Sequence, residues 1–187
     1  MSIQIVPSHV AILVPSVRKA ADYLRQFDFE IGEEEIWEGE GTKEIYVEKG
    51  KCNSLLLMES FKAGAYQRAL KKRGPGLHHL AIDVLNLDAF IESISGSGWL
   101  LHPISLQTIK QAQTAYLARP GFSALIEVHE RKEFAESPLF VSGVSFAIAP
   151  ASHNLVKVIG LSEIVKPSNE NPALVLNGRS VLVRELL

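Results

Sequence analysis

The chain has 187 residues, of which 47% are hydrophobic and 21% charged, and its formal net charge is −2. This composition is typical of a globular protein long enough to bury a core, and it excludes the strong basic excess that nucleic-acid binding usually requires. Cys52 is the only cysteine, no apolar run reaches about 18 residues and no secretory signal is recognised, so we expect a cytoplasmic protein that binds no membrane.

The first predicted unit begins with a β-strand over residues 9–14, where an apolar run follows His9. Apolar side chains then recur at i, i+3, i+4 and i+7, which is the stripe of an amphipathic helix, at Val17, Ala20, Ala21 and Leu24. Short runs of β-forming residues follow between turn residues, at 29–31, 45–47 and 54–58. The unit therefore has the order βαβββ.

The same pattern repeats at His79, which follows His9 by 70 positions. A connection with a short helical stretch, residues 61–76, separates the two copies. The second helix is predicted over 87–94, and the later strands over 99–101, 114–117 and 124–129. The sequence thus predicts an α+β fold of two βαβββ modules, residues 7–60 and 75–130, in one domain over residues 1–130.

Residues 142–187 are predicted to form an additional, degenerate βαβββ module. Its first strand carries Val144 where the other copies have histidine. A helix over 153–160 and three short strands follow, and the pair Asn177-Gly178 is a strong signal for a hairpin turn. We expect this module to hold no ligand and to complete a surface or to pair with another subunit, most simply in a homodimer.

Three polar residues at related places in the modules indicate a metal site. His9 and His79 begin the first strand of each module, so both face whatever a curved sheet encloses. Glu127 lies between apolar residues of a predicted strand, where a carboxylate is unfavourable unless it is paired or binds a cation. Two histidines and one carboxylate suit a divalent metal with open coordination positions. The matching place in the first module, 47 residues after His9, is Leu56, which offers no donor.

Each of these histidines also has a structural explanation. A single strand histidine is more often a hydrogen-bonded structural residue than a metal ligand. We expect His78 to point to the opposite face of its strand from His79, as a packed or exposed side chain. His129, near the end of its strand, is equally compatible with support of Glu127 and with plain exposure.

Three segments resemble a known family: PSHVAILVPSVRKAADYL from residue 7, GPGLHHLAIDVLNLDAFIESI from residue 74 and AYLARPGFSALIEV from residue 115. They are similar to the vicinal oxygen chelate superfamily of glyoxalases, bleomycin resistance proteins and dioxygenases, and within it most to methylmalonyl-CoA epimerases. The resemblance implies paired βαβββ modules that form a cupped mixed sheet around one divalent ion, which the substrate chelates through neighbouring oxygens. It implies that His79 and Glu127 are ligands, whereas Leu56 departs from the usual Gln or Glu.

The resemblance further implies an isomerase or lyase in which a divalent ion (Co, Mn, Ni, Zn or Fe) acts as a Lewis acid on a chelated carbonyl. Its most specific form is an epimerase of a 2-methyl acyl-CoA thioester. Glu44, in a Glu-Ile pair, matches a catalytic glutamate of the epimerases and is expected to be the base. Metal-bound Glu127 is expected to exchange the proton on the other face of the substrate carbon.

Two alternatives remain at the level of sequence. One is an Fe(II) extradiol-type dioxygenase, which needs no such base. The other, suggested by Leu56, is a metal-free small-molecule binding protein of the antibiotic-resistance type. A basic cluster either attracts the phosphates of an acyl-CoA or forms a solvated helix face, at Arg68, Lys71, Lys72 and Arg73.

Overall fold

The structure, a computed structural model, describes residues 3–134 and 136–187. The first module comprises β1 (Ile5–Leu13), α1 (Val17–Arg25), β2 (Ile31–Trp37), β3 (Thr42–Val47) and β4 (Ser54–Ser60). A connecting helix, α2 (Ala65–Arg73), leads to the second module, which comprises β5 (Gly76–Val84), α3 (Leu87–Ser93), β6 (Leu100–Leu101), α4 (Ser105–Ala112), β7 (Thr114–Arg119) and β8 (Phe122–Glu130). The predicted α+β fold with two βαβββ modules is confirmed.

Helix α4 is an insertion that the sequence did not predict. It lies between the second and third strands of its module, where the first module has only a turn. Its one buried side chain is Ser105, while Leu106 is exposed. Ile109 is partly buried against the core, but over eight residues the apolar pattern is too short to predict a helix from the sequence.

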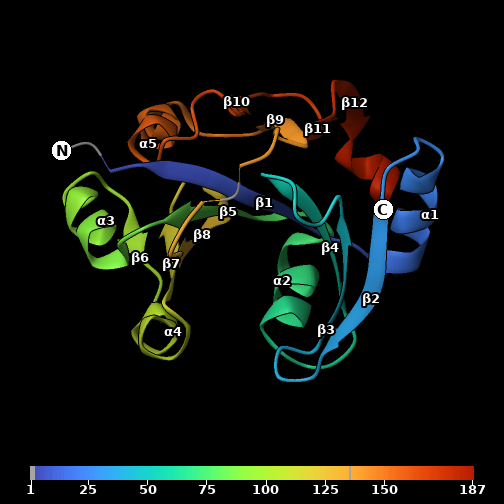
Figure 1. Cartoon of the computed structure of the whole chain (residues 1–187), viewed down its shortest axis with the longest axis horizontal. Coiled ribbons are helices and arrows are strands. Elements are labelled where there is room, and N and C mark those ends of the chain that lie inside the picture. Colours follow the sequence, from blue (N-terminus) through green and yellow to red (C-terminus); the bar gives the residue numbers. More distant parts are fainter. Residues whose placement is uncertain (1–2, 135) are drawn as a thin grey trace.

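The two modules form one mixed sheet with the strand order β2-β3-β4-β1-β5-β8-β7-β6 (Figure 1). The first strands, β1 and β5, run antiparallel at the centre, and each pairs in parallel with the last strand of its own module. The halves are therefore related by a pseudo-twofold axis between β1 and β5. This arrangement brings the strand histidines, 70 positions apart in sequence, to one place.

The helices begin in the same way in both modules. Ser16 and Asn86 are the N-cap residues of α1 and α3, and each accepts a hydrogen bond from a backbone N–H of the first turn. A glutamate from the last strand of each module accepts a further N–H: Glu59 from Val17 at 3.0 Å and Glu130 from Leu87 at 2.7 Å. Each helix is thus tied to the strand that completes its module.

The two faces of the sheet differ in what they bury. The outer face supplies the main core, and α1 and α3 pack against it with apolar side chains such as Leu24 and Phe90. The inner face has a small apolar cluster of its own, formed by Ala11, Leu13, Leu56 and Met58. Helix α2 covers this cluster with Tyr66, Ala69 and Leu70. The rest of the inner face is left for the polar residues.

A β-bulge occurs at the same place in both central strands. The pairing of β1 with β5 skips Ser8 on one strand and His78 on the other, which are 70 positions apart. A bulge turns two successive side chains to one side of the sheet. His78 therefore lies on the inner face beside His79, with their Nδ1 atoms 2.9 Å apart. The expectation that His78 points to the opposite face was wrong, because strict alternation along the strand fails at the bulge.

The C-terminal unit contains β9 (Val141–Phe146), α5 (His153–Val158), β10 (Val165–Pro167), β11 (Ala173–Leu176) and β12 (Arg179–Leu182), and a 3₁₀ helix ends it at Val183–Leu186. It keeps the predicted βαβββ order. Its own sheet has the order β10-β9-β11-β12, so its first strand pairs with the second and third instead of the fourth. Asn177 and Gly178 both have positive φ, 46° and 80°, as the predicted hairpin turn requires.

The C-terminal unit covers the outer face of the large sheet, across the top of Figure 1. Phe146 packs edge-on against Phe122 of β8, which in turn meets Trp99, with ring centroids 5.3 and 5.0 Å apart. The indole of Trp99 also donates to the carbonyl of Leu155 in α5 at 3.1 Å. One continuous core thus joins the C-terminal unit to both modules. In the part of the chain that the structure describes, no helix is long and apolar enough to cross a membrane.

Candidate metal centre

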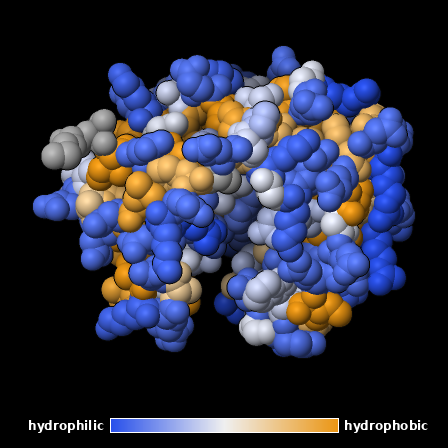
Figure 2. Space-filling view, in the orientation of Figure 1, coloured by the Kyte–Doolittle hydropathy of each residue, from blue (hydrophilic) through white to orange (hydrophobic). Residues whose placement is uncertain are grey.

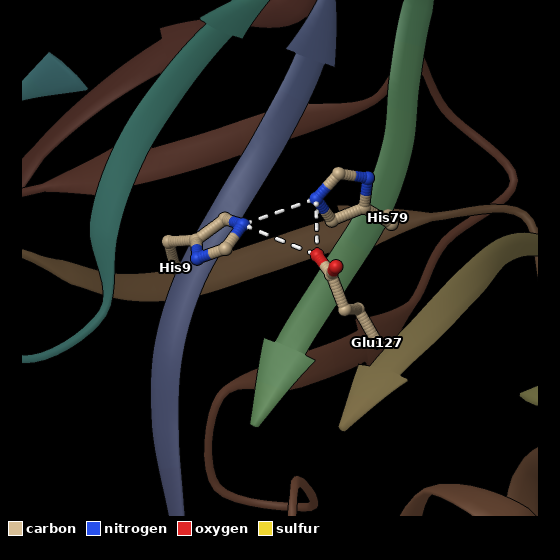
Figure 3. Close-up of side chains that lie close together, drawn as sticks. All are labelled: His9, His79 and Glu127. Atoms are coloured by element: carbon tan, nitrogen blue, oxygen red, sulfur yellow. Dashed lines mark hydrogen bonds and ion pairs between the residues drawn. The ribbon is translucent and has the colours of Figure 1, made fainter. Parts of the chain in front are cut away.

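Three side chains converge on the inner face from the central strands (Figure 3). His9 comes from β1, His79 from β5 and Glu127 from β8. The Nε2 atoms of the two histidines are 3.0 Å apart, and the Oε2 atom of Glu127 is 3.1 Å from His79 Nε2 and 3.6 Å from His9 Nε2. Within residues 3–134 and 136–187, this is the one group of at least three possible ligands whose donor atoms lie within 4.8 Å of one another. The predicted triad is therefore assembled.

The electrostatics of these residues suit a cation. Burial, with a smaller contribution from His79, lowers the pKa of His9 to about 3, so this imidazole is neutral and has a lone pair to offer. Burial alone would raise the pKa of Glu127, but His79 and His129 outweigh it and hold the pKa well below its usual value. Imidazole nitrogen and ionised carboxylate oxygen form a donor set for a divalent transition metal. The residues present thus fit the metal that the fold implies.

Neighbouring side chains hold the candidate ligands in place. Tyr116 Oη donates to Glu127 Oε1 at 2.7 Å, and His129 Nε2 lies 3.3 Å from the same oxygen, so Oε2 is left facing the histidines. On the far side, His79 Nδ1 faces His78 Nδ1. Partners of this kind fix the orientation and tautomer of metal ligands. The structure places His129 as a support of Glu127, one of the two roles considered for it.

A short polar chain continues from His129. Its Nδ1 atom is 3.2 Å from Asp83 Oδ1, and the same oxygen accepts from Arg131 Nε at 3.2 Å. Burial lowers the pKa of His129, but hydrogen bonds to Asp83 and Glu127 outweigh it and raise the pKa to about 9. His129 is therefore charged at neutral pH and donates to a carboxylate on each side.

Leu56 occupies the place in the first module that Glu127 occupies in the second. Glu127 pairs with Ala81 of β5 and Tyr116 of β7, whereas Leu56 pairs with Ala11 of β1 and Tyr46 of β3. Ala11 and Ala81, like the two tyrosines, are 70 positions apart. The register thus agrees with the match inferred from sequence spacing. A three-donor centre leaves coordination positions for oxygen atoms of another molecule.

The candidate ligands open onto a cavity of about 370 Å³ that is lined by residues of both modules. Figure 2 shows the surface hollowed between the two halves of the molecule. Its inner wall holds His9, His79 and Glu127, and its mouth includes Lys49, Lys51 and Arg131. The predicted basic cluster Arg68, Lys71, Lys72 and Arg73 is instead exposed on α2 and does not line this cavity.

Glu44 lines the same cavity from β3. Its carboxylate is buried and accepts a hydrogen bond from Thr42 Oγ1 at 2.8 Å. Burial raises the pKa of Glu44 to about 6, although the bond from Thr42 opposes the shift. A carboxylate with a pKa close to neutral is suited to accept and return a proton. The structure therefore brings the predicted base into the same cavity as the predicted ligands.

Sequence reasoning missed two tyrosines of the centre. Tyr46 and Tyr116 line the cavity from β3 and β7, and they are separated by the same 70 positions as His9 and His79. Their equal offset from the two histidines was the signal that could have found them. Asp83 carried no such signal, because the equivalent residue of the first module is the apolar Leu13.

Comparison with known proteins agrees with this geometry. The family model described as "Glyoxalase/Bleomycin resistance protein/Dioxygenase superfamily" matches residues 8–116, more than half of the chain. The chain belongs to this superfamily. No curated protein sequence matches it.

Solved structures that are similar to this chain include a hypothetical protein and methylmalonyl-CoA epimerases. A hypothetical protein of Bacillus halodurans C-125 is 25% identical, with a TM-score of 0.59, over 72% of this chain and 99% of that chain. Methylmalonyl-CoA epimerase from Mycobacterium tuberculosis is 25% identical, with a TM-score of 0.53, over 67% of this chain and 87% of that chain. A Streptomyces coelicolor methylmalonyl-CoA epimerase in complex with 2-nitronate-propionyl-CoA, 20% identical over 70% and 100% of the two chains with a TM-score of 0.53, shares the fold.

Proposed function

We propose that the protein is a divalent-metal-dependent isomerase or lyase that removes a proton next to a chelated carbonyl group. The observation that carries the proposal is the meeting of two features in one cavity. His9, His79 and Glu127 present a donor set for a metal, and Glu44 presents a buried carboxylate whose pKa is about 6. A metal-binding module without this chemistry has no use for such a carboxylate, which is unfavourable to bury.

A metal held by these three residues would act as a Lewis acid on two neighbouring substrate oxygens and so favour the enolate. Glu44 would accept the proton from the substrate carbon, and Thr42 would keep one of its oxygens in position. In an epimerase a second group exchanges a proton on the opposite face, and Glu127 is our candidate for that role. The low pKa of Glu127 supports its role as a ligand more strongly than this second one.

The most specific substrate we propose is a 2-methyl acyl-CoA thioester, as in methylmalonyl-CoA epimerase. The support is the likeness to the Mycobacterium tuberculosis enzyme, together with the chemistry of the residues that line the cavity. Apolar Leu56 and Met58 offer a surface for a methyl group, and Lys49, Lys51 and Arg131 lie at the mouth, where an anionic carrier would pass. The homodimer expected from the sequence stays a prediction.

The proposal is tested first by metal content. Protein purified without an affinity tag is analysed by elemental mass spectrometry, and wild type is compared with His79→Ala. We expect about one equivalent of a divalent metal in wild type and none in the variant, because the two remaining ligands, His9 and Glu127, would bind a metal only weakly. The metal-loaded wild type should then exchange the C2 proton of methylmalonyl-CoA with deuterium from solvent, followed by NMR.

A second candidate function rests on the donor set itself. Two histidines and one carboxylate, with Leu56 in the fourth place, is the ligand pattern of non-haem Fe(II) oxygenases. Iron in the purified protein, oxygen uptake with a catechol and an unimpaired Glu44→Gln variant would establish this alternative. Failure to bind any metal, even after reconstitution with each ion, would exclude both enzymes and leave a small-molecule binding protein.

A further inference from the structure

The two cavity tyrosines occupy equivalent positions but have different partners. Tyr116 pairs across the strands with Glu127, and its hydroxyl donates to that carboxylate at 2.7 Å. Tyr46 pairs in the same way with Leu56, the equivalent of Glu127. The apolar side chain of Leu56 accepts no hydrogen bond. In the first module a tyrosine hydroxyl therefore lies beside Leu56, which stands where the second module has its candidate metal ligand Glu127.

The ring of Tyr46 has close neighbours, although within residues 3–134 and 136–187 its hydroxyl has no hydrogen-bond partner. The rings of His9 and Tyr46 form a T-shaped pair with centroids 5.8 Å apart, and Lys49 Nζ lies 5.2 Å from the centroid of the Tyr46 ring. Among the described residues no hydrogen bond involves Tyr46 Oη, and no fully buried side-chain oxygen or nitrogen is left without a partner. Since Tyr46 lines the cavity, its hydroxyl is open to whatever enters.

We propose that Tyr46 is a substrate-binding residue that donates a hydrogen bond to the substrate oxygen placed beside Leu56. The inference rests on the proposed function, because it needs a substrate that chelates a metal. It adds a requirement on the ligand: one of its two neighbouring oxygens must be an acceptor, and the best acceptor is one that bears negative charge, as in an enolate or a carboxylate. Tyr116 has a different role, which is to position Glu127.

The wall around Tyr46 sets the direction of binding. Leu56 and Met58 are the apolar equivalents of Glu127 and His129, as the strand register shows. Tyr46 pairs with Leu56 and Glu44 pairs with Met58, so each apolar side chain has a polar cross-strand neighbour that also lines the cavity. An oxygen bound beside Leu56 would meet the hydroxyl of Tyr46, and the neighbouring apolar part of the ligand would pack against Leu56 and Met58.

The test uses Co²⁺ as the metal and oxalate, a dianion with two neighbouring oxygens, as the probe. Wild type, Tyr46→Phe and Tyr116→Phe are each titrated with Co²⁺ and then with oxalate, and binding is followed by calorimetry and by the visible absorption of cobalt. The two variants form a matched pair, because each loses one hydroxyl at equivalent positions. Phenylalanine keeps the ring contacts with His9 and Lys49, and thermal unfolding verifies that both variants are folded.

We expect Tyr46→Phe to bind Co²⁺ like wild type and oxalate about tenfold more weakly, the effect of losing one hydrogen bond to a charged oxygen. Tyr116→Phe should show the converse, with Co²⁺ affinity reduced about tenfold and oxalate affinity of the loaded protein unchanged. If oxalate binds Co²⁺-loaded Tyr46→Phe as tightly as wild type, the role of Tyr46 is wrong while the proposed function stands. If wild type binds no Co²⁺, both are overturned.

Discussion

The position of the Glu44 carboxylate is unfavourable for the stability of the folded protein. It is buried, and its pKa is raised from 4.5 to about 6, chiefly because burial disfavours the charged form. Above pH 6 the side chain is ionised in both folded and unfolded protein, so the full penalty applies, about 2 kcal/mol. Below pH 4.5 it is protonated in both states and the penalty disappears. Such a cost is typical of a residue kept for its chemistry.

We therefore predict opposite effects of Glu44→Gln on stability and on turnover. At pH 8 the variant should be more stable by up to about 2 kcal/mol in urea unfolding, and this gain should vanish near pH 4. Deuterium exchange into methylmalonyl-CoA should fall at least a hundredfold, with metal content unchanged. Full exchange activity in Glu44→Gln would remove this residue from the mechanism.

The same carboxyl group sets the expected pH dependence of wild type. Glu44 can accept a proton only when it is ionised, so the exchange rate should fall as pH decreases through about 6 in the absence of other changes. A bound divalent cation favours the ionised form and moves this limb to lower pH. The exchange rate is measured between pH 4.5 and 8.5, with metal content checked at each pH. These rates show directly the pH at which exchange falls off. A limb above pH 7 would contradict the assignment.

At the residue scale, the sequence was most informative where the two copies agree. His9 and His79 were found by the repeat, and Glu127 by the oddity of a carboxylate among apolar residues. The side of the strand on which His78 lies could not be predicted, because it depends on a bulge that shows only in the pairing of β1 with β5. Tyr46 was overlooked because an aromatic residue in a strand ordinarily belongs to the core.

At the scale of elements, the two helix starts make a matched experiment. Glu59 and Glu130 each accept the first N–H of the helix in their own module, at 3.0 and 2.7 Å. A negative group at a helix N-terminus also interacts favourably with the helix dipole. We predict that Glu59→Ala and Glu130→Ala each lower the free energy of unfolding by about 1 kcal/mol.

The double variant should lose the sum of the two effects, since the helices share no hydrogen-bond partner at these sites. Exposed Glu33 of β2 makes no hydrogen bond to the start of either helix in the described part of the chain, and Glu33→Ala serves as the control with an expected change within about 0.5 kcal/mol. Urea unfolding followed by circular dichroism measures all four variants. An unchanged midpoint in both single variants would show that these contacts do not contribute to stability.

Elements were predictable where one periodic pattern extends over enough residues. The strands and helices of both modules were found because apolar residues alternate or recur with the spacing of a helix. Two features were not: α4, which buries no apolar stripe, and the strand order of the C-terminal unit. In the structure β9 pairs with β10 and β11, and the apolar pattern along β9 does not indicate which neighbours it takes.

At the scale of the whole molecule, the C-terminal unit closes the core that both modules leave open on the outer face. Phe146 is fully buried and meets Phe122, which meets Trp99. We predict that Phe146→Ala lowers the free energy of unfolding by about 3–5 kcal/mol, the usual cost of a large cavity in a core. The near-ultraviolet circular dichroism of Trp99 should be lost in the same transition as the far-ultraviolet signal.

The conservative change Phe146→Leu is the control for this prediction and should cost no more than about half as much. Two separate transitions, with Trp99 reporting only the first, would show that the C-terminal unit unfolds alone and that the core is not shared. Metal binding by Phe146→Ala below its unfolding transition should match wild type, because the inner face is built by other side chains.

The shared bulge also bears on the history of the molecule. Ser8 and His78, the helix-capping glutamates and the two cavity tyrosines recur at one constant offset or one residue beyond it, which is the mark of a tandem duplication. On the inner face the halves differ at positions that carry the candidate chemistry: Leu13 against Asp83, Leu56 against Glu127 and Met58 against His129, with Glu44 against Thr114 in the opposite sense. The candidate ligand Glu127 and its support His129 thus lie in the second module, whereas the candidate base Glu44 lies in the first. A nearly symmetric scaffold therefore encloses an asymmetric cavity, in which the two sides of a bound molecule would meet different side chains.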